Sequence, residues 1–419
     1  MENPILLLFL LIIFGFDNRL NGNKLTFQIS ENFIKLTNKM DWLFFDNDDR
    51  LISKSYSDED ISILVGENGS GKSTYLNQLA KLHLNSGRNV IAIANTVYDK
   101  FNINRVNFNH LRISQGKSLS KNVIKKIVKI LEYTNSKGIF NLINAFDYVG
   151  FDSKITIEIK GLSTNYQELI KNSSFNEYYK FTLKYNLDHY FREALYQNKF
   201  NVDLKKHHIN KTNDIFVLFL LSYENELKKL GIIKKIKIFL HKENREIELN
   251  SASSGELSLL NTVIYITAYI DDNTVILIDE PENSLHPKWQ IEYIKQIVDL
   301  FYFFQPKIIL ATHSPLIING GFLYNKNINI FKNVENNFRS MKHINNIEQM
   351  YEQYFNITTP ENRFLSDFIV TKFNLLNSKK IRLNDFLSLL DSYILTSYDD
   401  KQKLALQNIQ KLAKENFAK

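Results

Sequence analysis

The sequence predicts an α/β fold in which a mixed β-sheet core is interrupted by a mostly helical lobe and followed by C-terminal helices. A glycine-rich stretch at residues 66–71 stands between an apolar run and an amphipathic pattern, which indicates a strand, a loop and a helix. Short apolar runs occur at 61–65, 90–94, 275–278 and 308–311. Such runs are typical of strands covered on both faces, and strands that alternate with helices are typical of α/β proteins.

The composition fits a globular protein and excludes several kinds of chemistry. Hydrophobic residues make up 44% and charged residues 23% of the 419 residues, which is ordinary for folded domains. The formal net charge of +7 is compatible with a polyanionic partner, but a Lys-rich and Asn-rich chain reaches that charge without one. The absence of cysteine excludes disulfides, thiolate nucleophiles and cysteine-ligated zinc.

The N-terminal apolar run ILLLFLLIIF, at 5–14, could be read as the core of a signal peptide. It is shorter than the roughly 20 residues that span a bilayer, and no basic residue precedes Arg19. No small-residue cleavage site follows it. We interpret it as a buried first strand, with a second strand at 25–30, and expect a cytoplasmic protein without a membrane segment.

The pattern changes in the middle of the chain. Amphipathic stretches at 121–133, 178–196 and 214–230 predict helices, and the alternating KITIEIK at 154–160 predicts a strand. No heptad pattern persists over three or four heptads, so a long coiled-coil arm is not expected. This region is therefore interpreted as an inserted lobe.

The core is expected to resume with a hairpin, IKIFLHK followed by REIEL, that turns around Glu243 and Asn244. Beyond residue 355, two or three amphipathic helices are predicted. The expected segments are the first part of the core at 1–118, the lobe at 119–232, the second part of the core at 233–345 and a helical region at 346–419.

The stretch GENGSGKST fits the phosphate-binding pattern G-x-x-x-x-G-K-[ST] in its proper context, after a strand and before a helix. Its glycines let backbone N–H groups turn toward phosphate oxygens, and the following helix start favours an anion. Lys72 is expected to reach the β- and γ-phosphates, and Ser73 to place its hydroxyl on Mg²⁺. The candidate nucleotide-binding residues of this loop are Gly66, Glu67, Asn68, Gly69, Ser70, Gly71, Lys72, Ser73 and Thr74.

Two carboxylates end the apolar run TVILIDE. Asp279 is placed to hold Mg²⁺, directly or through water, and Glu280 to act as general base on an attacking water. A strand that ends in surface acids would look the same by itself. The distance of about 200 residues from the glycine-rich loop favours the functional interpretation.

Two shorter motifs carry meaning mainly through their position. SSGE, ending at Glu256, precedes a helix, where Ser254 and the N–H of Gly255 could donate to a phosphate. Alone, Ser-Gly before a helix is usually a cap. His313 in THSP follows another apolar run and could contact the γ-phosphate and sense hydrolysis, although a lone histidine is more often structural.

Together these four motifs, in this order, resemble the ABC-type ATPases: Walker A, signature, Walker B and switch histidine. The resemblance implies ATP and Mg²⁺ as ligands and a head-to-tail homodimer, in which Ser254, Gly255 and Glu256 of one subunit close over ATP held by Lys72 of the other. Gln115, in LRISQGKS, is a candidate for the glutamine that contacts Mg²⁺ in that family; a surface glutamine would read the same.

The stretch DEPENSLHPKWQ is similar to the soluble ABC-type ATPases of the overcoming-lysogenization-defect and RecF-like group. Such ATPases occur beside nucleases in anti-phage systems such as Septu, PARIS and certain retrons. No acidic cluster of a fused Toprim nuclease follows His313, so the effector is expected in trans.

The resemblance implies an ATP-driven dimeric switch that controls a partner effector, most simply a nuclease of anti-phage defence. The main alternative is a DNA repair or clamp-type ATPase that binds DNA in an ATP-gated way. A transporter subunit is disfavoured by the DEPENSLHP stretch, and a self-contained nuclease lacks a visible metal cluster. Any assembly above the dimer stays open.

Overall fold

The computed structural model of the chain describes residues 49–53, 60–96, 98–112, 122, 136–192, 198–205, 212–335, 337–359, 362–397 and 399–417. The apolar run at 5–14, the second strand expected at 25–30, most of the helix expected at 121–133 and Gln115 lie outside these residues. The predictions made for them stay predictions.

A seven-stranded sheet forms the core, in the strand order β11-β10-β1-β9-β8-β2-β3. Every neighbouring pair is parallel except β10 and β11, so the prediction of a mixed sheet is confirmed. The strands are β1 (Ile61–Val65), β2 (Asn89–Ala94), β3 (Phe108–Arg112), β8 (Thr274–Asp279), β9 (Lys307–Thr312), β10 (Asn329–Val334) and β11 (Asn337–Met341).

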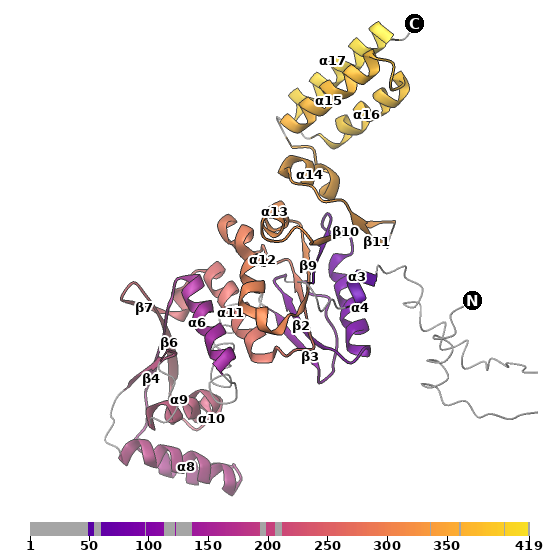
Figure 1. Cartoon of the computed structure of the whole chain (residues 1–419). Helices are drawn as coiled ribbons and strands as arrows, with labels where there is room; N and C mark the ends of the chain where they lie inside the picture. Colours follow the sequence, from indigo (N-terminus) through magenta and orange to yellow (C-terminus); the bar gives the residue numbers. More distant parts are fainter. Residues whose placement is uncertain are drawn as a thin grey trace, which may run out of the picture. The chain divides into compact units, whose positions relative to one another are not determined.

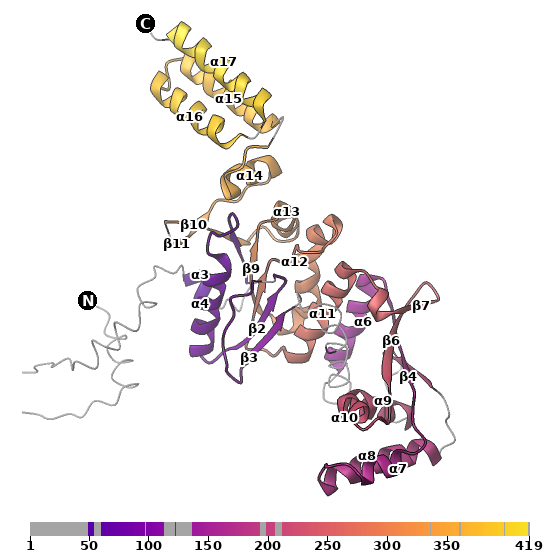
Figure 2. The ribbon, with the colours of Figure 1, turned by 180° about the vertical axis from the view of Figure 1, so that it is seen from behind.

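Helices cover both faces of this sheet, which explains its continuous apolar strands. In β8, Val275 and Leu277 face the cluster that contains α4 (Lys72–Asn85), while Ile276 and Ile278 face the opposite cluster. That second cluster contains α11, α12 and α13, so α4 lies on one side of the sheet and these three helices on the other (Figures 1 and 2). Their bounds are α11 (Ser254–Tyr269), α12 (Pro287–Phe301) and α13 (Pro315–Tyr324).

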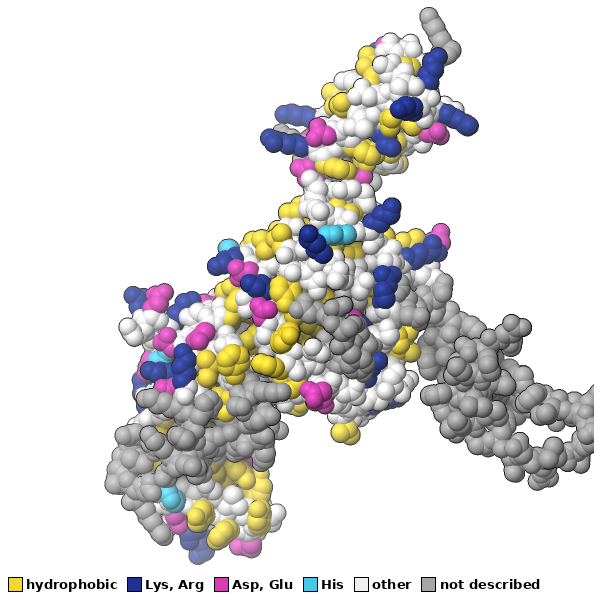
Figure 3. Space-filling model, in the orientation of Figure 1, with side chains coloured by type: hydrophobic (Ala, Val, Ile, Leu, Met, Phe, Trp, Pro, Cys, Tyr) yellow, Lys and Arg dark blue, Asp and Glu magenta, His cyan; other side chains and the backbone are white. Residues whose placement is uncertain are grey.

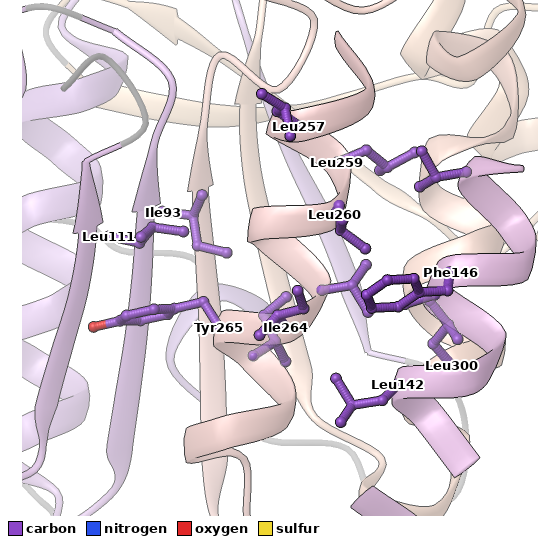
Figure 4. Packing of buried hydrophobic residues seen from close by; sticks show 14 of the residues in the cluster. Ile93, Leu111, Leu142, Phe146, Leu257, Leu259, Leu260, Ile264, Tyr265 and Leu300 are labelled. Carbon is purple, nitrogen blue, oxygen red and sulfur yellow. The ribbon is translucent and has the colours of Figure 1, made fainter. Parts of the chain in front are cut away.

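Helix α11 is enclosed between the sheet and α6 (Ser136–Val149) (Figure 4). Its Leu260 and Ile264 lie in one cluster with Ile93 of the sheet and Phe146 of α6. A helix that is apolar around most of its circumference must be covered on most sides, and each fully buried leucine or isoleucine contributes about 1.5–3 kcal/mol. The position of α11 is therefore fixed from both sides.

The predicted hairpin is confirmed, with β6 (Lys235–Lys242) and β7 (Arg245–Glu248) joined by Glu243 and Asn244 at positive φ of 50° and 61°. Positive φ at both loop residues is typical of tight hairpin turns. The expectation that this hairpin resumes the central sheet is wrong, because β6 pairs with β4 (Asp152–Lys160) in a second, four-stranded antiparallel sheet. Its alternating buried residues suit a half-buried antiparallel sheet better than a parallel core.

The lobe combines that second sheet with helices. Its strand order is β5-β4-β6-β7, and the strand predicted from KITIEIK is the central β4, beside β5 (Lys199–Asp203). The helix predicted at 178–196 is present over its described part, and the helix predicted at 214–230 is divided into two, which meet at Tyr223. The described helices beyond α6 are α7 (Tyr166–Lys171), α8 (Glu177–Arg192), α9 (Thr212–Ser222) and α10 (Glu224–Lys229).

The helices described after β11 are α14 (Ile347–Phe355), α15 (Arg363–Asn377), α16 (Leu383–Thr396) and α17 (Asp400–Phe417). The last three share a hydrophobic cluster of their own, which includes Leu365, Phe386 and Leu406, whereas Met350 and Phe355 of α14 belong to the cluster that contains α11, α12 and α13. The short elements are α3 (Asp49–Ile52) and the 3₁₀ turns Leu249–Ser251 and Tyr302–Phe304. Among the described helices, none has both the length and the apolar character needed to cross a bilayer.

Candidate nucleotide-binding site

The glycine-rich loop leaves the carboxyl end of β1 and leads into α4. Gly66, Gly69 and Gly71 have φ angles of 145°, 81° and 87°, a region that side chains disfavour. At Gly66 an added Cβ would lie 2.8 Å from Ser70 Oγ. The loop therefore depends on glycine for its path, as the sequence pattern predicts.

Lys72 lies folded over this loop. Its side chain is 5% exposed, and its Nζ donates to Gly66 O at 2.8 Å and to Glu67 O at 2.9 Å. Burial lowers the pKa of Lys72, while the carboxylates of Glu280, Asp279, Glu282 and Glu67 act in the opposite direction. The ammonium group thus lies against the first two residues of the loop, where phosphate oxygens could replace the two carbonyl oxygens as its hydrogen-bond acceptors.

Asp279 ends β8 on the face of the sheet that α4 covers, because its side chain follows the alternation of Val275 and Leu277. It is fully buried, and neither carboxylate oxygen has a well-aligned hydrogen-bond donor among the described residues. Burial raises the pKa of Asp279 to about 6; a contact from the Ser73 hydroxyl opposes this, as does the charge of Lys72.

The residues around Asp279 fit a magnesium ion. A buried carboxylate without donors is costly, and a bound cation would compensate for its desolvation. The hydroxyl of Ser73 and the carboxylate of Asp279 are both oxygen ligands of the kind that Mg²⁺ prefers. Ser73 and Asp279 are thus the pair that would hold it.

Glu280 stands at the first position of the turn after β8, with a φ of 51°. Its backbone N donates to Ala311 O at 2.9 Å, which fixes the main chain to β9. Its carboxylate oxygen Oε2 accepts from Asn283 Nδ2 at 2.9 Å, and the same amide donates to Asn95 O at 3.1 Å. The predicted general base is therefore held by its neighbours in a defined orientation.

His313 follows β9 and is held by Glu282. The backbone N of His313 donates to Glu282 Oε1 at 2.7 Å, and imidazole Nδ1 lies 3.1 Å from the same oxygen. Glu282 is 7% exposed, whereas the His313 side chain is 37% exposed. The buried carboxylate of Glu282 beside Nδ1 orients the imidazole ring, and the part of the ring away from Glu282 stays accessible to solvent.

The remainder of DEPENSLHPKWQ also serves this turn. Ser314 Oγ donates to Gln290 Oε1 at 2.6 Å, and Gln290 Nε2 donates to Leu285 O at 3.0 Å. Sequence reasoning missed Asn95, Glu282, Asn283 and Gln290 as parts of the site. Only the polar character of the stretch after Glu280 could have pointed to three of them, and nothing marked Asn95.

The SSGE motif begins α11 with a capping box. Ser253 Oγ accepts from Glu256 N at 3.2 Å, and Ser253 N donates to Glu256 Oε2 at 3.1 Å. Glu256 also pairs with Lys242 at 2.8 Å, so its carboxylate is engaged within its own chain. Ser254 is exposed, and a Cβ at Gly255 would lie 2.5 Å from Ser284 O. The helix start is packed tightly against the turn after β8 while Ser254 faces outward.

The glycine-rich loop and SSGE belong to opposite faces of one sheet. The loop begins α4, which packs on β2, β8 and β9 from one side, whereas α11 packs on β2 and β3 from the other. Within one chain, the sheet separates these two helices.

A polar cluster outside the four motifs supports the loop from behind. Asn356 Nδ2 donates to Glu67 Oε1 at 2.9 Å, and Lys332 Nζ donates to Asn356 Oδ1 at 2.8 Å. Asn333 Nδ2 donates to Ser70 O at 2.5 Å. Burial lowers the pKa of Lys332, against the charge of Glu67. The end of α14 is thus bonded to the glycine-rich loop.

The structure brings Lys72, Asp279 and Glu280 together with Ser73 and Glu67, as their mutual electrostatic effects show. Asn68, Gly69 and Thr74 lie on the exposed side of the loop. The nucleotide roles of these residues, and of Ser254, Gly255, Glu256 and His313, stay predictions. Gln115 lies outside the described residues.

Residues 118–319, just under half of the chain, match the family described as "AAA domain, putative AbiEii toxin, Type IV TA system". The match contains SSGE, Asp279, Glu280 and His313 and begins after the glycine-rich loop. The glycine-rich loop has the sequence pattern and the strand–loop–helix setting typical of a P-loop. The family match supports an ATPase domain of the AAA/ABC type.

Two curated proteins and one solved structure are similar to parts of the chain. An uncharacterized protein of Methanocaldococcus jannaschii is 27% identical over 31% of this chain and 16% of its own length. Protein ea59 of Escherichia phage lambda is 30% identical over 18% of this chain and 14% of its own length. The chain thus spans only a small part of these relatives.

The solved structure is the Smc head domain of Pyrococcus furiosus with an extended coiled coil, bound to the C-terminal domain of ScpA. It is 12% identical and covers 64% of this chain and 65% of its own, with a TM-score of 0.22. This similarity is too weak to inform either fold or function.

Proposed function

We propose that the chain is an ATP-hydrolysing switch in which ATP joins two copies head to tail. Each ATP would be held by the glycine-rich loop and Lys72 of one copy and by Ser254 and Gly255 of the other. Hydrolysis would separate the copies, because ATP favours the closed state only while its γ-phosphate bridges them. In this proposal the helical lobe and the C-terminal helices transmit the change between joined and separated copies to an effector protein.

The observation that carries the proposal is the placement of the two helix starts predicted to bind phosphate on opposite faces of one sheet. The loop before α4 is glycine-lined, and Ser254 at the start of α11 is exposed. Both kinds of helix start favour an anion. Since the sheet separates them, a second copy is the simplest way to bring both to one phosphate chain.

The site residues divide the chemistry among them. Lys72 would neutralise charge on the phosphates, and Ser73 and Asp279 would hold a magnesium ion, which would supply further charge neutralisation. Glu280 orients and deprotonates the attacking water, and His313 contacts the γ-phosphate. ATP and Mg²⁺ are accordingly the proposed ligands.

The test is the state of assembly of Glu280→Gln in the full chain. With Mg²⁺ and ATP this variant is expected to stop turning over and to elute as a dimer, since it binds ATP but cannot cleave it. Adding Ser254→Glu should abolish the dimer while ATP binding persists, because the new carboxylate would face the phosphate. Ser251→Glu, an exposed residue of the preceding 3₁₀ turn, is the matched control.

Normal turnover by Glu280→Gln would refute the assigned base. If Glu280→Gln binds ATP but stays monomeric at every protein concentration, the bridging role of Ser254 is refuted.

The proposed biological setting is control of an effector protein, a nuclease of anti-phage defence, in the cytoplasm. Its support is the similarity of DEPENSLHPKWQ to ATPases found beside nucleases. The alternative, ATP-gated DNA binding, draws on the net charge of +7 alone. On the described part of the face in Figure 3, basic and acidic side chains are interspersed, so this part of the surface does not form a continuous basic patch for DNA.

A further inference from the structure

Asn283 makes a contact with the proposed general base that the four motifs do not account for. We propose that Asn283, braced by Asn95, is a positioning residue that fixes the carboxylate of Glu280 for attack by water. The inference rests on the proposed ATPase function and assigns residues that set its rate. Asn283 acts through Glu280 and does not itself touch the nucleotide.

The side-chain amide nitrogen of Asn283 carries two hydrogens and donates them to two different acceptors. Its Nδ2 donates to Glu280 Oε2 at 2.9 Å and to Asn95 O at 3.1 Å. An amide that satisfies two acceptors in different directions cannot rotate without losing one bond. Glu280 Oε2 is therefore held in place, and the proton of the attacking water would pass to Oε1.

Asn95 provides the rigid side of this arrangement. It follows β2, whose last residue Ala94 pairs with Asp279. Its backbone N donates to Asp279 O at 3.0 Å, and its Nδ2 donates to Pro281 O at 3.4 Å. Asn95 thus contacts residues on both sides of Glu280 and carries the orientation of Asn283 back to the sheet.

The backbone conformation of Glu280 needs support from neighbouring residues. Its φ of 51° is disfavoured for a residue with a side chain, so the turn persists only where surrounding contacts hold it. The bond from Glu280 N to Ala311 O fixes the main chain to β9, and Asn283, bonded to Asn95 after β2, fixes the side chain. The base is thus held from β9 and β2, the two strands that flank β8.

A purely structural role for Asn283 is the competing explanation, since its backbone N also donates to Glu280 O at 3.2 Å and closes the turn. A structural asparagine would affect folding and ATP binding along with hydrolysis. A positioning residue would affect hydrolysis alone, and only while Glu280 is present to be positioned.

The experiment is a double-mutant cycle on the full chain with Asn283→Ala, Glu280→Gln and their combination. Single-turnover hydrolysis of Mg-ATP and equilibrium binding of ATP are measured for each variant, with thermal unfolding as a check. We expect Asn283→Ala to slow hydrolysis about 10- to 100-fold, since small misplacements of reacting groups have effects of this size. ATP affinity should change less than about 3-fold, and the double variant should be no slower than Glu280→Gln.

Asn273→Ala is the matched control. Asn273 precedes β8 at the opposite edge of the sheet, and its Nδ2 donates to Gly87 O at 3.1 Å, so it also links the flanks of β8 and β2. Its removal should leave hydrolysis within about 2-fold of the unmodified chain.

Three results would overturn the inference: unchanged hydrolysis in Asn283→Ala, an equal loss of ATP affinity and rate, or an additive further loss in the double variant. If Glu280→Gln itself hydrolyses ATP normally, the proposed function fails first. If Glu280→Gln is inactive while Asn283→Ala is fully active, only the role of Asn283 fails.

Discussion

The phosphate-binding loop and the turn after β8 follow parallel strands at the same edge of the sheet, yet they are held in different ways. The loop owes its path to local backbone conformation, with Gly66, Gly69 and Gly71 at positive φ. The turn owes its geometry to side chains from distant parts of the chain. Asn95 reaches Pro281, and Glu282 reaches His313.

This difference separates two kinds of sequence information. A glycine at positive φ is required by the conformation of that residue alone, so a short pattern specifies the loop. A buried carboxylate that accepts from a residue 31 positions away is required by tertiary contacts, and no local pattern states it. We expect substitutions in the loop to act on binding and those in the turn to act on hydrolysis.

The largest effect is expected from Lys72→Ala. In the proposed function the side chain supplies a charge-assisted contact to the phosphates, so ATP affinity should fall about 100-fold, or about 2.7 kcal/mol. Isothermal titration calorimetry measures this change directly. Lys81→Ala, an exposed lysine of the same helix, is the control and should bind ATP normally. Equal affinity in Lys72→Ala and Lys81→Ala would remove the loop from the nucleotide site.

The parts of the molecule that the sequence predicts follow the same division. Continuous apolar runs predicted β1, β2, β8 and β9, and the glycine pattern predicted the loop. The strands β3 and β10 were missed, since FNHLR and NIFKNV mix polar with apolar residues. β3 is an edge strand and β10 lies next to the edge strand β11, and strands near an edge bury fewer side chains, so their pattern is weaker.

The hairpin at 235–248 shows how topology escapes local patterns. The strands and the turn at Glu243 and Asn244 were predictable, because two polar residues between alternating strands mark a tight turn. Their pairing with β4, about 80 residues earlier, was not. Pairing partners depend on which faces the whole chain must bury, and the sequence of the hairpin does not contain that information.

Glu282→Ala is expected to weaken ATP binding less than Lys72→Ala does and to act mainly on turnover. The change removes the acceptor of the His313 backbone N and the carboxylate beside its Nδ1. The free energy of unfolding should fall by about 1–3 kcal/mol, since a partly buried N–H loses its partner. Turnover should fall about 10-fold, with ATP affinity changed less than about 3-fold.

Denaturant unfolding and steady-state ATPase assays measure the two effects of Glu282→Ala. Glu246→Ala is the control, because Glu246 pairs with Lys199 at the surface, where such pairs contribute less than about 1 kcal/mol. Unchanged turnover in Glu282→Ala would mean that the orientation of His313 does not matter for hydrolysis.

The smallest effect is expected from Asn356→Ala, which tests whether the loop is as self-sufficient as its glycines suggest. Asn356 bonds Glu67 in the loop and Lys332 in β10, so its loss removes one hydrogen bond from each. Each hydrogen bond contributes about 1 kcal/mol, and ATP affinity should therefore weaken about 2- to 5-fold. Asn374→Ala, an exposed residue of α15, is the control.

Titration of the Asn356→Ala chain with ATP distinguishes two kinds of loop. An unchanged affinity would mean that the loop does not need Asn356, and that its glycines with the bond from Asn333 to Ser70 O are sufficient to hold it. The expected weakening would instead make the end of α14 part of the loop's support. Because Phe364 N donates to Glu348 Oε2 at 2.9 Å, α14 is also bonded to the first turn of α15. Nucleotide binding would then be linked to the C-terminal helices through Asn356.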